Sequence, residues 1–106
     1  MELVEIRPKA FNYYRKHVRH NADITYDQAQ RKLTRNIMLA KLLPPRNQED
    51  EEKGNKLYLY GNLTILVRGN TVINIKNQKG YNLFTGGWEL DRFKFVEMTK
   101  EYGIEV

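Results

Sequence analysis

Two Gly-Asn pairs constrain this sequence more than any other feature, because each lies between two β-rich runs. The pairs are Gly61-Asn62 and Gly69-Asn70. Glycine readily adopts the positive φ angle that the first position of a two-residue turn requires, so each pair predicts a tight β-hairpin. The sequence therefore predicts a three-stranded antiparallel β-meander, with strands over residues 56–60, 63–68 and 71–76.

Two-residue turns also fix the register of such a meander. The predicted cross-strand pairs are Tyr60 with Leu63, Tyr58 with Ile65, and Leu66 with Ile73. Alternate side chains point to opposite faces of a sheet, so the meander has one aliphatic and one mixed face. The aliphatic face carries Leu57, Leu59, Thr64, Leu66, Arg68, Ile73 and Ile75. The mixed face carries Tyr58, Tyr60, Leu63, Ile65, Val67, Val72, Asn74 and Lys76. We expect the second helix to cover the aliphatic face.

Two amphipathic helices are predicted before the meander, over residues 8–20 and 25–43. Pro8 suits the first position of a helix, where a backbone N–H has no partner in any case. Thr25 and Gln28 have the spacing of a capping box, which predicts the start of the second helix.

The remaining segments complete the predicted fold. The second helix would end before Pro44 and Pro45, because proline cannot continue a helix and restricts the residue before it. The acidic segment 46–55 predicts a mobile loop, and residues 81–84 a short fourth strand. A C-terminal helix is expected over 88–102. Its predicted apolar face carries Leu90, Phe93 and Val96.

Length and element order together predict one α+β domain over residues 1–106. It would contain two N-terminal helices, a three- to four-stranded antiparallel β-meander and a C-terminal helix. The chain has no cysteine and only two histidines, so we expect no disulfide, no metal site and no cofactor. Its apolar runs are too short for a membrane span, and its first residues lack a signal-peptide pattern. We therefore expect a cytoplasmic protein without membrane partners.

Basic residues are concentrated in one part of the chain. Residues 7–46 carry ten lysines and arginines but only two acidic residues, Asp23 and Asp27. A clustered positive charge is typical of proteins that bind RNA or another nucleic acid. The alternative is that the protein is basic without binding nucleic acid, as phage and bacterial proteins often are.

The first helix, the second helix and the meander resemble part of a known superfamily over about residues 15–78. The residues that carry the resemblance are the stretch from Lys16 to Asp27 and the strand segments 57–68 and 71–75. In element order and strand composition they are similar to the RelE/ParE-like toxin and colicin-type ribonuclease superfamily. The resemblance implies a metal-independent endoribonuclease, which directs an RNA 2′-hydroxyl at the adjacent phosphate.

Candidate site residues follow from the resemblance and from the charge pattern. The resemblance implies catalytic roles for His17, His20 and Arg19, and on a helix the two histidines would share a face. Residues predicted to bind nucleic acid are Arg15, Lys16, Arg31, Lys32, Arg35, Tyr58, Tyr60 and Lys76. Each has a structural alternative: the histidines can cap a helix, the cations of the second helix can be solvated, and the tyrosines can pack in the core.

The leading prediction is a small basic protein that engages RNA as a toxin-type ribonuclease. One alternative is a phage or mobile-element protein that binds nucleic acid without cleaving it. Another is a protein of the same origin that inhibits a host protein, with an acidic protein partner meeting its basic surface. The aromatic-rich C-terminal helix either closes the core or forms an interface, including that of a homodimer.

Overall fold

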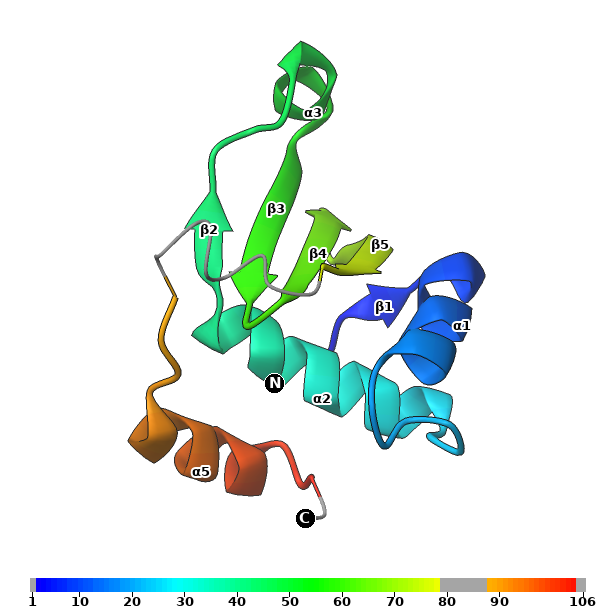
Figure 1. Cartoon of the computed structure of the whole chain (residues 1–106), viewed down its shortest axis with the longest axis vertical. Coiled ribbons are helices and arrows are strands. Elements are labelled where there is room, and N and C mark those ends of the chain that lie inside the picture. The colour runs from blue at the N-terminus through cyan, green and yellow to red at the C-terminus, as the bar shows by residue number, and fades with distance from the viewer. Residues whose placement is uncertain (1, 79–87, 105–106) are drawn as a thin grey trace.

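The β-meander forms as the glycine turns predict, and Figure 1 shows it at the centre of an α+β fold. The computed structural model describes residues 2–78 and 88–104. Strands β3 (Asn55–Tyr60), β4 (Leu63–Arg68) and β5 (Thr71–Asn77) run antiparallel in sequence order. Gly61 and Gly69 have φ angles of 60° and 61°, which confirms the role of both glycines in the turns.

The predicted register holds between β3 and β4 but changes between β4 and β5. Tyr60 lies opposite Leu63, and Tyr58 lies opposite Ile65, as expected. The prediction that Leu66 faces Ile73 is wrong, because the pairing shifts between Leu66 and Val67. Leu66 instead faces Asn74, and Val67 faces Val72. Ile73 is thus the extra residue of a β-bulge, which reverses the faces of the residues after it.

Two short edge strands extend the meander into a five-stranded mixed sheet of order β1-β5-β4-β3-β2. Strand β1 (Glu5–Ile6) pairs parallel with β5, and β2 (Lys41–Leu43) pairs antiparallel with β3. The prediction that Lys41–Leu43 is helical is wrong. Proline disfavours a helical conformation in the residue before it, and the backbone is already extended at Ala40.

The two N-terminal helices are confirmed, with ends earlier than predicted. Helix α1 spans Pro8–His17, and helix α2 spans Tyr26–Leu39. The capping box at Thr25 is formed in full, since Thr25 and Gln28 each accept from the other's backbone N–H. Helix α1 ends before residue 20 because Val18 is extended and His20 has a φ angle of 68°.

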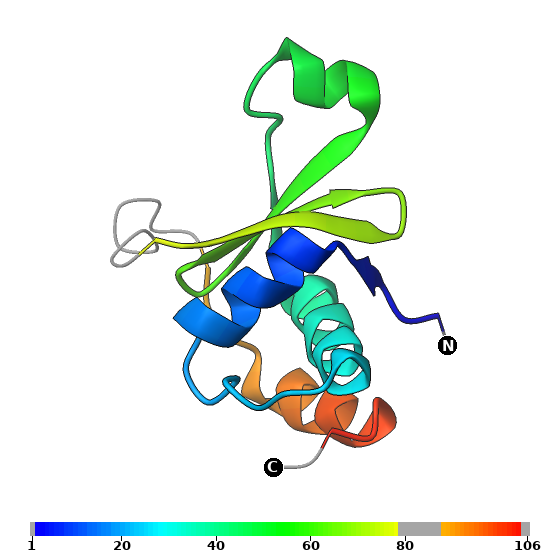
Figure 2. The ribbon, with the colours of Figure 1, turned by 90° about the vertical axis from the view of Figure 1, so that its right-hand side faces the viewer.

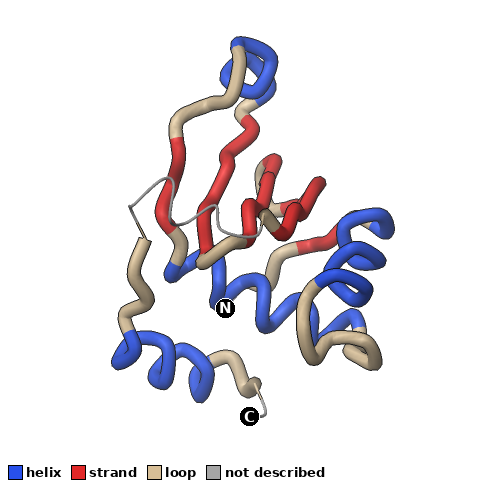
Figure 3. The backbone as a smooth tube through the Cα atoms, in the orientation of Figure 1, coloured by secondary structure: helices blue, strands red, loops and turns tan. Residues whose placement is uncertain are grey.

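Two further helices complete the described chain (Figure 3). The acidic segment predicted as a loop contains helix α3 (Gln48–Lys53), capped by the Asn47 side chain and ended by Gly54 at a φ angle of 71°. Helix α5 (Arg92–Glu101) begins after Asp91, whose side chain accepts from the Lys94 N–H, so it is shorter than the predicted 88–102. The predicted strand 81–84 lies outside the described residues.

Helices α1 and α2 lie together beneath one face of the sheet, and α5 lies beyond α2 (Figure 2). The core they enclose contains Leu63, Ile65, Val67, Val72 and Ile75 from the sheet. The prediction that α2 covers the aliphatic face is therefore wrong. The bulge moves Ile75 onto the mixed face, opposite Ile65. That face thereby gains an aliphatic side chain, which belongs to the core.

Candidate nucleic-acid interface

Helix α1 and its flanking residues present a row of basic side chains to solvent. Ala10 and Tyr14 bury the other side of the helix against the sheet, because they recur at the spacing of one helical face. The cations occupy the remaining positions and are all exposed. We call these residues the α1 surface: Arg7, Lys9, Arg15, Lys16 and Arg19.

No carboxylate among the described residues forms an ion pair with the α1 surface. The ion pairs between described residues are Asp27–Arg31, Arg46–Asp50 and Glu49–Lys53. Within the α1 surface, Arg15 donates to the Ala22 carbonyl at 3.1 Å, and its guanidinium lies 5.6 Å from the centre of the Phe11 ring. Such contacts orient the guanidinium and leave its charge uncompensated, so the surface suits an anionic partner.

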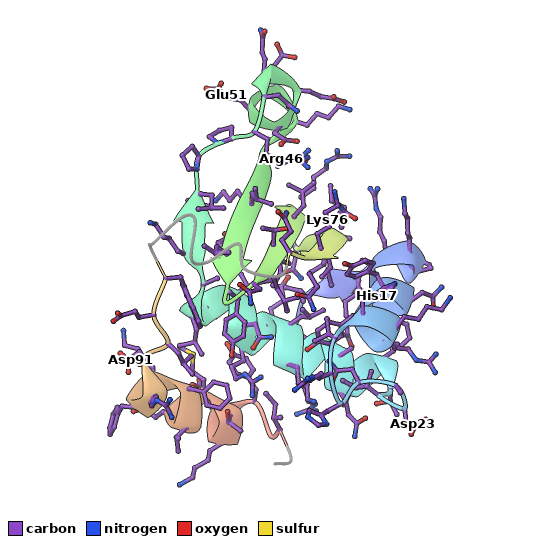
Figure 4. The ribbon with its side chains drawn as sticks, in the orientation of Figure 1. His17, Asp23, Arg46, Glu51, Lys76 and Asp91 are labelled. Atoms are coloured by element: carbon purple, nitrogen blue, oxygen red, sulfur yellow. The ribbon has the colours of Figure 1, made fainter. Side chains whose placement is uncertain are left out.

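Acidic side chains gather at a different end of the molecule, on helix α3. Figure 1 shows α3 beyond the tips of β2 and β3, at one end of the 38 Å long axis. Glu51 and Arg46 lie there in Figure 4, well away from His17 at the end of α1. The charge is thus separated in space, and the acidic run does not cover the basic helix.

The three cations predicted as a basic edge of α2 are not equally exposed. Arg31 donates to Asp27 at 2.9 Å and to the Tyr102 carbonyl at 2.8 Å. Lys32 is half-buried and donates to Asn21 Oδ1 at 3.1 Å. Arg35 is only 8% exposed. The C-terminal part of the chain therefore contacts Arg31 and Arg35, while Lys32 contacts the loop after α1.

Arg35 is held in a buried polar cluster, and no carboxylate of residues 2–78 or 88–104 forms an ion pair with it. Its Nε and Nη2 donate to Asn36 Oδ1, its Nη1 donates to Thr99 Oγ1 at 3.1 Å, and its guanidinium lies 4.4 Å from the centre of the Phe95 ring. Burial lowers the pKa of Arg35 and raises the pKa of the nearby Tyr14 phenol to about 12. Arg35 consequently joins α2 to α5 and cannot meet a nucleic acid in this conformation.

The two histidines lie in different surroundings. The prediction that they share a helix face is wrong, because α1 ends at His17. The His17 ring lies 4.5 Å from the Tyr13 ring, and its carbonyl accepts from the Asn77 side chain. His20 instead lines a cavity together with residues of α2. Arg19 is exposed between them.

The predicted stacking tyrosines and the strand lysine belong to the sheet and not to the α1 surface. Tyr58 and Tyr60 are half-buried and pack against the core, as their structural alternative proposed. The Tyr60 ring lies 4.8 Å from the Trp88 ring, so it is engaged within the protein. Lys76 pairs with Thr64, on the face of the sheet away from the helices.

A cavity of about 800 Å³ lies between the loop after α1, the first turns of α2 and the segment after α5. The sequence predicts His20, Arg31 and Lys32 as site residues, but it does not predict that all three line one cavity. It also missed Ala22, Gln28, Gly103 and Ile104, which line the same walls. No local pattern pairs residues this far apart in sequence, so only the folded chain reveals their proximity.

Metal binding and membrane insertion find no support in the part of the chain that the structure describes. Within residues 2–78 and 88–104, no group of three or more His, Cys, Asp or Glu side chains is placed to hold a metal ion. The described helices are all too short or too polar to cross a bilayer.

Comparisons with known proteins give one consistent match. A family model described as YorE matches residues 4–101. The SPbeta prophage-derived uncharacterized protein YorE of Bacillus subtilis (strain 168) is 37% identical over 106 residues, which cover 99% of this chain and 85% of that protein. No solved structure matches the chain. The predicted resemblance to the RelE/ParE-like toxin and colicin-type ribonuclease superfamily is therefore wrong, because the family that matches is YorE.

Proposed function

The chain belongs to the YorE family, which includes a prophage-derived protein, and we propose that it binds nucleic acids without cleaving them. In this proposal the α1 surface contacts the phosphate backbone. The observation that carries the proposal is the row of five exposed cations on and beside α1, none ion-paired to a described residue.

The geometry of α1 supports contacts to a backbone rather than recognition of one base sequence. Lys9 and Lys16 are seven residues apart, which is about two helical turns, so their ammonium groups face the same way. Arg15 lies in the last turn of α1, and Arg19 extends the charge past the end of the helix. Lysine and arginine contacts to phosphates provide affinity and position a protein, and they are independent of sequence.

Binding without cleavage is supported by the surroundings of the two histidines among the described residues. The family that matches the chain is YorE and not a ribonuclease superfamily, and His17 and His20 lie in different surroundings. A general acid and a general base must both reach the reacting phosphate. An arrangement in which one histidine packs on Tyr13 and the other lines a cavity favours binding alone.

The test compares two triple variants that remove the same charge from different faces. The first changes Lys9, Lys16 and Arg19 to glutamine, and the second changes three exposed cations of α5. The α5 residues are Arg92, Lys94 and Lys100. Fluorescence anisotropy with labelled duplex DNA, single-stranded DNA and RNA measures affinity over a range of salt concentrations. Each lost phosphate contact on a duplex lowers the slope of log K against log salt by about 0.9.

In the α1 variant we expect the slope of log K against log salt to fall in magnitude by about two to three. The α5 variant should keep the wild-type slope. Circular dichroism spectra and melting temperatures check that both variants stay folded. Equal losses in the two variants would mean that only net charge matters. Wild-type protein that binds none of the three probes at low salt would overturn the proposal, as would cleaved probe on a denaturing gel.

A further inference from the structure

The cavity beside α1 has the size and the wall chemistry of a ligand site. Its volume of about 800 Å³ lies within the usual range for ligand sites, and it is open to solvent, since most of its lining residues are exposed. Ile24 and Ile104 supply apolar wall, while Gln28 and Lys32 supply polar groups that can donate hydrogen bonds. A nucleobase needs just this combination, with apolar contact for its faces and hydrogen-bonding groups for its edges.

Lys32 is the one cation of the cavity wall that no described carboxylate neutralises. Its Nζ donates to Asn21 Oδ1, which uses one of the three ammonium donors. Arg31, by comparison, is tied to Asp27 and to the Tyr102 carbonyl. Partial burial and the neighbouring Arg35 lower the pKa of Lys32. An anionic group in the cavity would relieve both effects, because it compensates the charge.

The acidic residues of the wall do not cancel this preference. Asp27 is neutralised by Arg31 at 2.9 Å. Asp23 also lines the cavity, but it is exposed, so water and salt screen the charge of its carboxylate. A carboxylate at the rim accepts hydrogen bonds from the amino groups of bases, while Lys32 remains the group that favours phosphate.

The cavity adjoins the α1 surface at Ala22. A smaller hollow lined by Asn12, Arg15, Lys16 and Ala22 lies along α1. Ala22 lines this hollow and the cavity alike, so the two meet at a single small residue of the loop. A strand that follows the cations of α1 therefore arrives at the mouth of the cavity.

We propose that the cavity accepts one unpaired nucleotide of a strand whose backbone lies on the α1 surface, an inference that rests on the proposed function. Lys32 contacts the phosphate of this nucleotide, and Gln28 with the apolar wall receives its base. Bases of a duplex are held in the stack and do not enter. The protein consequently prefers single-stranded nucleic acid to duplex.

The experiment measures binding of labelled dT20, rU20 and a 20-base-pair DNA duplex to the full-length protein. Wild-type protein should bind at least one single strand about ten-fold more tightly than the duplex. Lys32→Gln should abolish most of this preference and change duplex affinity by less than about two-fold. Lys94→Gln, at an exposed position of α5, is the matched control and should alter neither. Whichever of dT20 and rU20 binds more tightly shows whether the site prefers deoxyribose or ribose.

A second variant separates the shape of the cavity from its charge. Ala22 is exposed, so Ala22→Trp adds a large side chain at the mouth without disturbing the core. This variant should lose the single-strand preference and keep duplex binding through the remaining cations. Equal affinity of wild-type protein for single strands and duplex would overturn this inference and leave the proposed function standing. So would Lys32 and Ala22 variants that weaken all probes equally. Failure of wild-type protein to bind any probe would overturn both.

Discussion

Arg35 is a cation of the kind that binds nucleic acid, but in the structure it joins α2 to α5. Spacing on the helix correctly places it on the same side as Arg31, and both looked like part of a basic edge. The cover over this edge comes from Thr99 and Phe95, far along the chain. The periodicity within α2 carries no information about that contact. The burial of Arg35 therefore cannot be predicted from the sequence.

We predict that Arg35→Ala lowers the free energy of unfolding by about 2–3 kcal/mol, because it leaves Asn36 and Thr99 without their buried donor. Arg35→Lys should recover little of this loss, since an ammonium cannot reproduce the planar contacts to Asn36 and the Phe95 ring. Urea unfolding gives the stability, and hydrogen exchange of α5 amides reports whether α5 detaches. Arg92→Ala, at an exposed position, is the control. Wild-type stability in Arg35→Ala would contradict the prediction.

Among the elements, those with complete local signals were predictable and those that depend on distant partners were not. The Gly-Asn turns and the Thr25 capping box each act within a few residues, and both formed as expected. Helix α5 is the contrary case. The apolar pattern predicts that Phe93 is on the buried face, but Phe93 is 78% exposed. The face of α5 that contacts α2 carries Phe95 and Thr99 instead. With Phe93, Phe95 and Val96 so close in sequence, the apolar pattern does not select a single face.

Helix α3 gives a prediction about pH at this scale. Hydrogen bonds from Arg46 and Asn55 lower the pKa of Asp50 from 3.8 to about 2. Because the folded-state pKa lies below the unfolded one, the charged form stabilises α3 above about pH 4, and this contribution is lost as pH falls toward 2. We expect NMR shifts of the α3 amides to report a transition near pH 2. Asp50→Asn should weaken α3 at neutral pH, unlike Glu51→Gln at an exposed position. A transition near pH 4 would contradict the role of these bonds.

At the scale of the whole molecule, the separated charges give a further prediction. Glutamine at Glu49, Glu51 and Glu52 would remove three negative charges from the α3 end of the long axis. Charges far from a bound strand are screened at physiological salt, where the Debye length is about 8 Å. We therefore expect this variant to change nucleic-acid affinity by less than about three-fold at 150 mM salt. A gain comparable to the loss in the α1 variant would show that net charge controls binding.

The pairing of β1 with β5 has a consequence for the order in which the chain assembles. Strands β3, β4 and β5 are consecutive and joined by tight turns, so their contacts form between near neighbours. Strand β1, by contrast, pairs with a distant part of the chain, since Glu5 lies opposite Thr71. Contacts between distant parts of a chain form slowly, because a long loop must close first. During synthesis β1 leaves the ribosome before β5, so it must wait for β5 before the sheet can be completed.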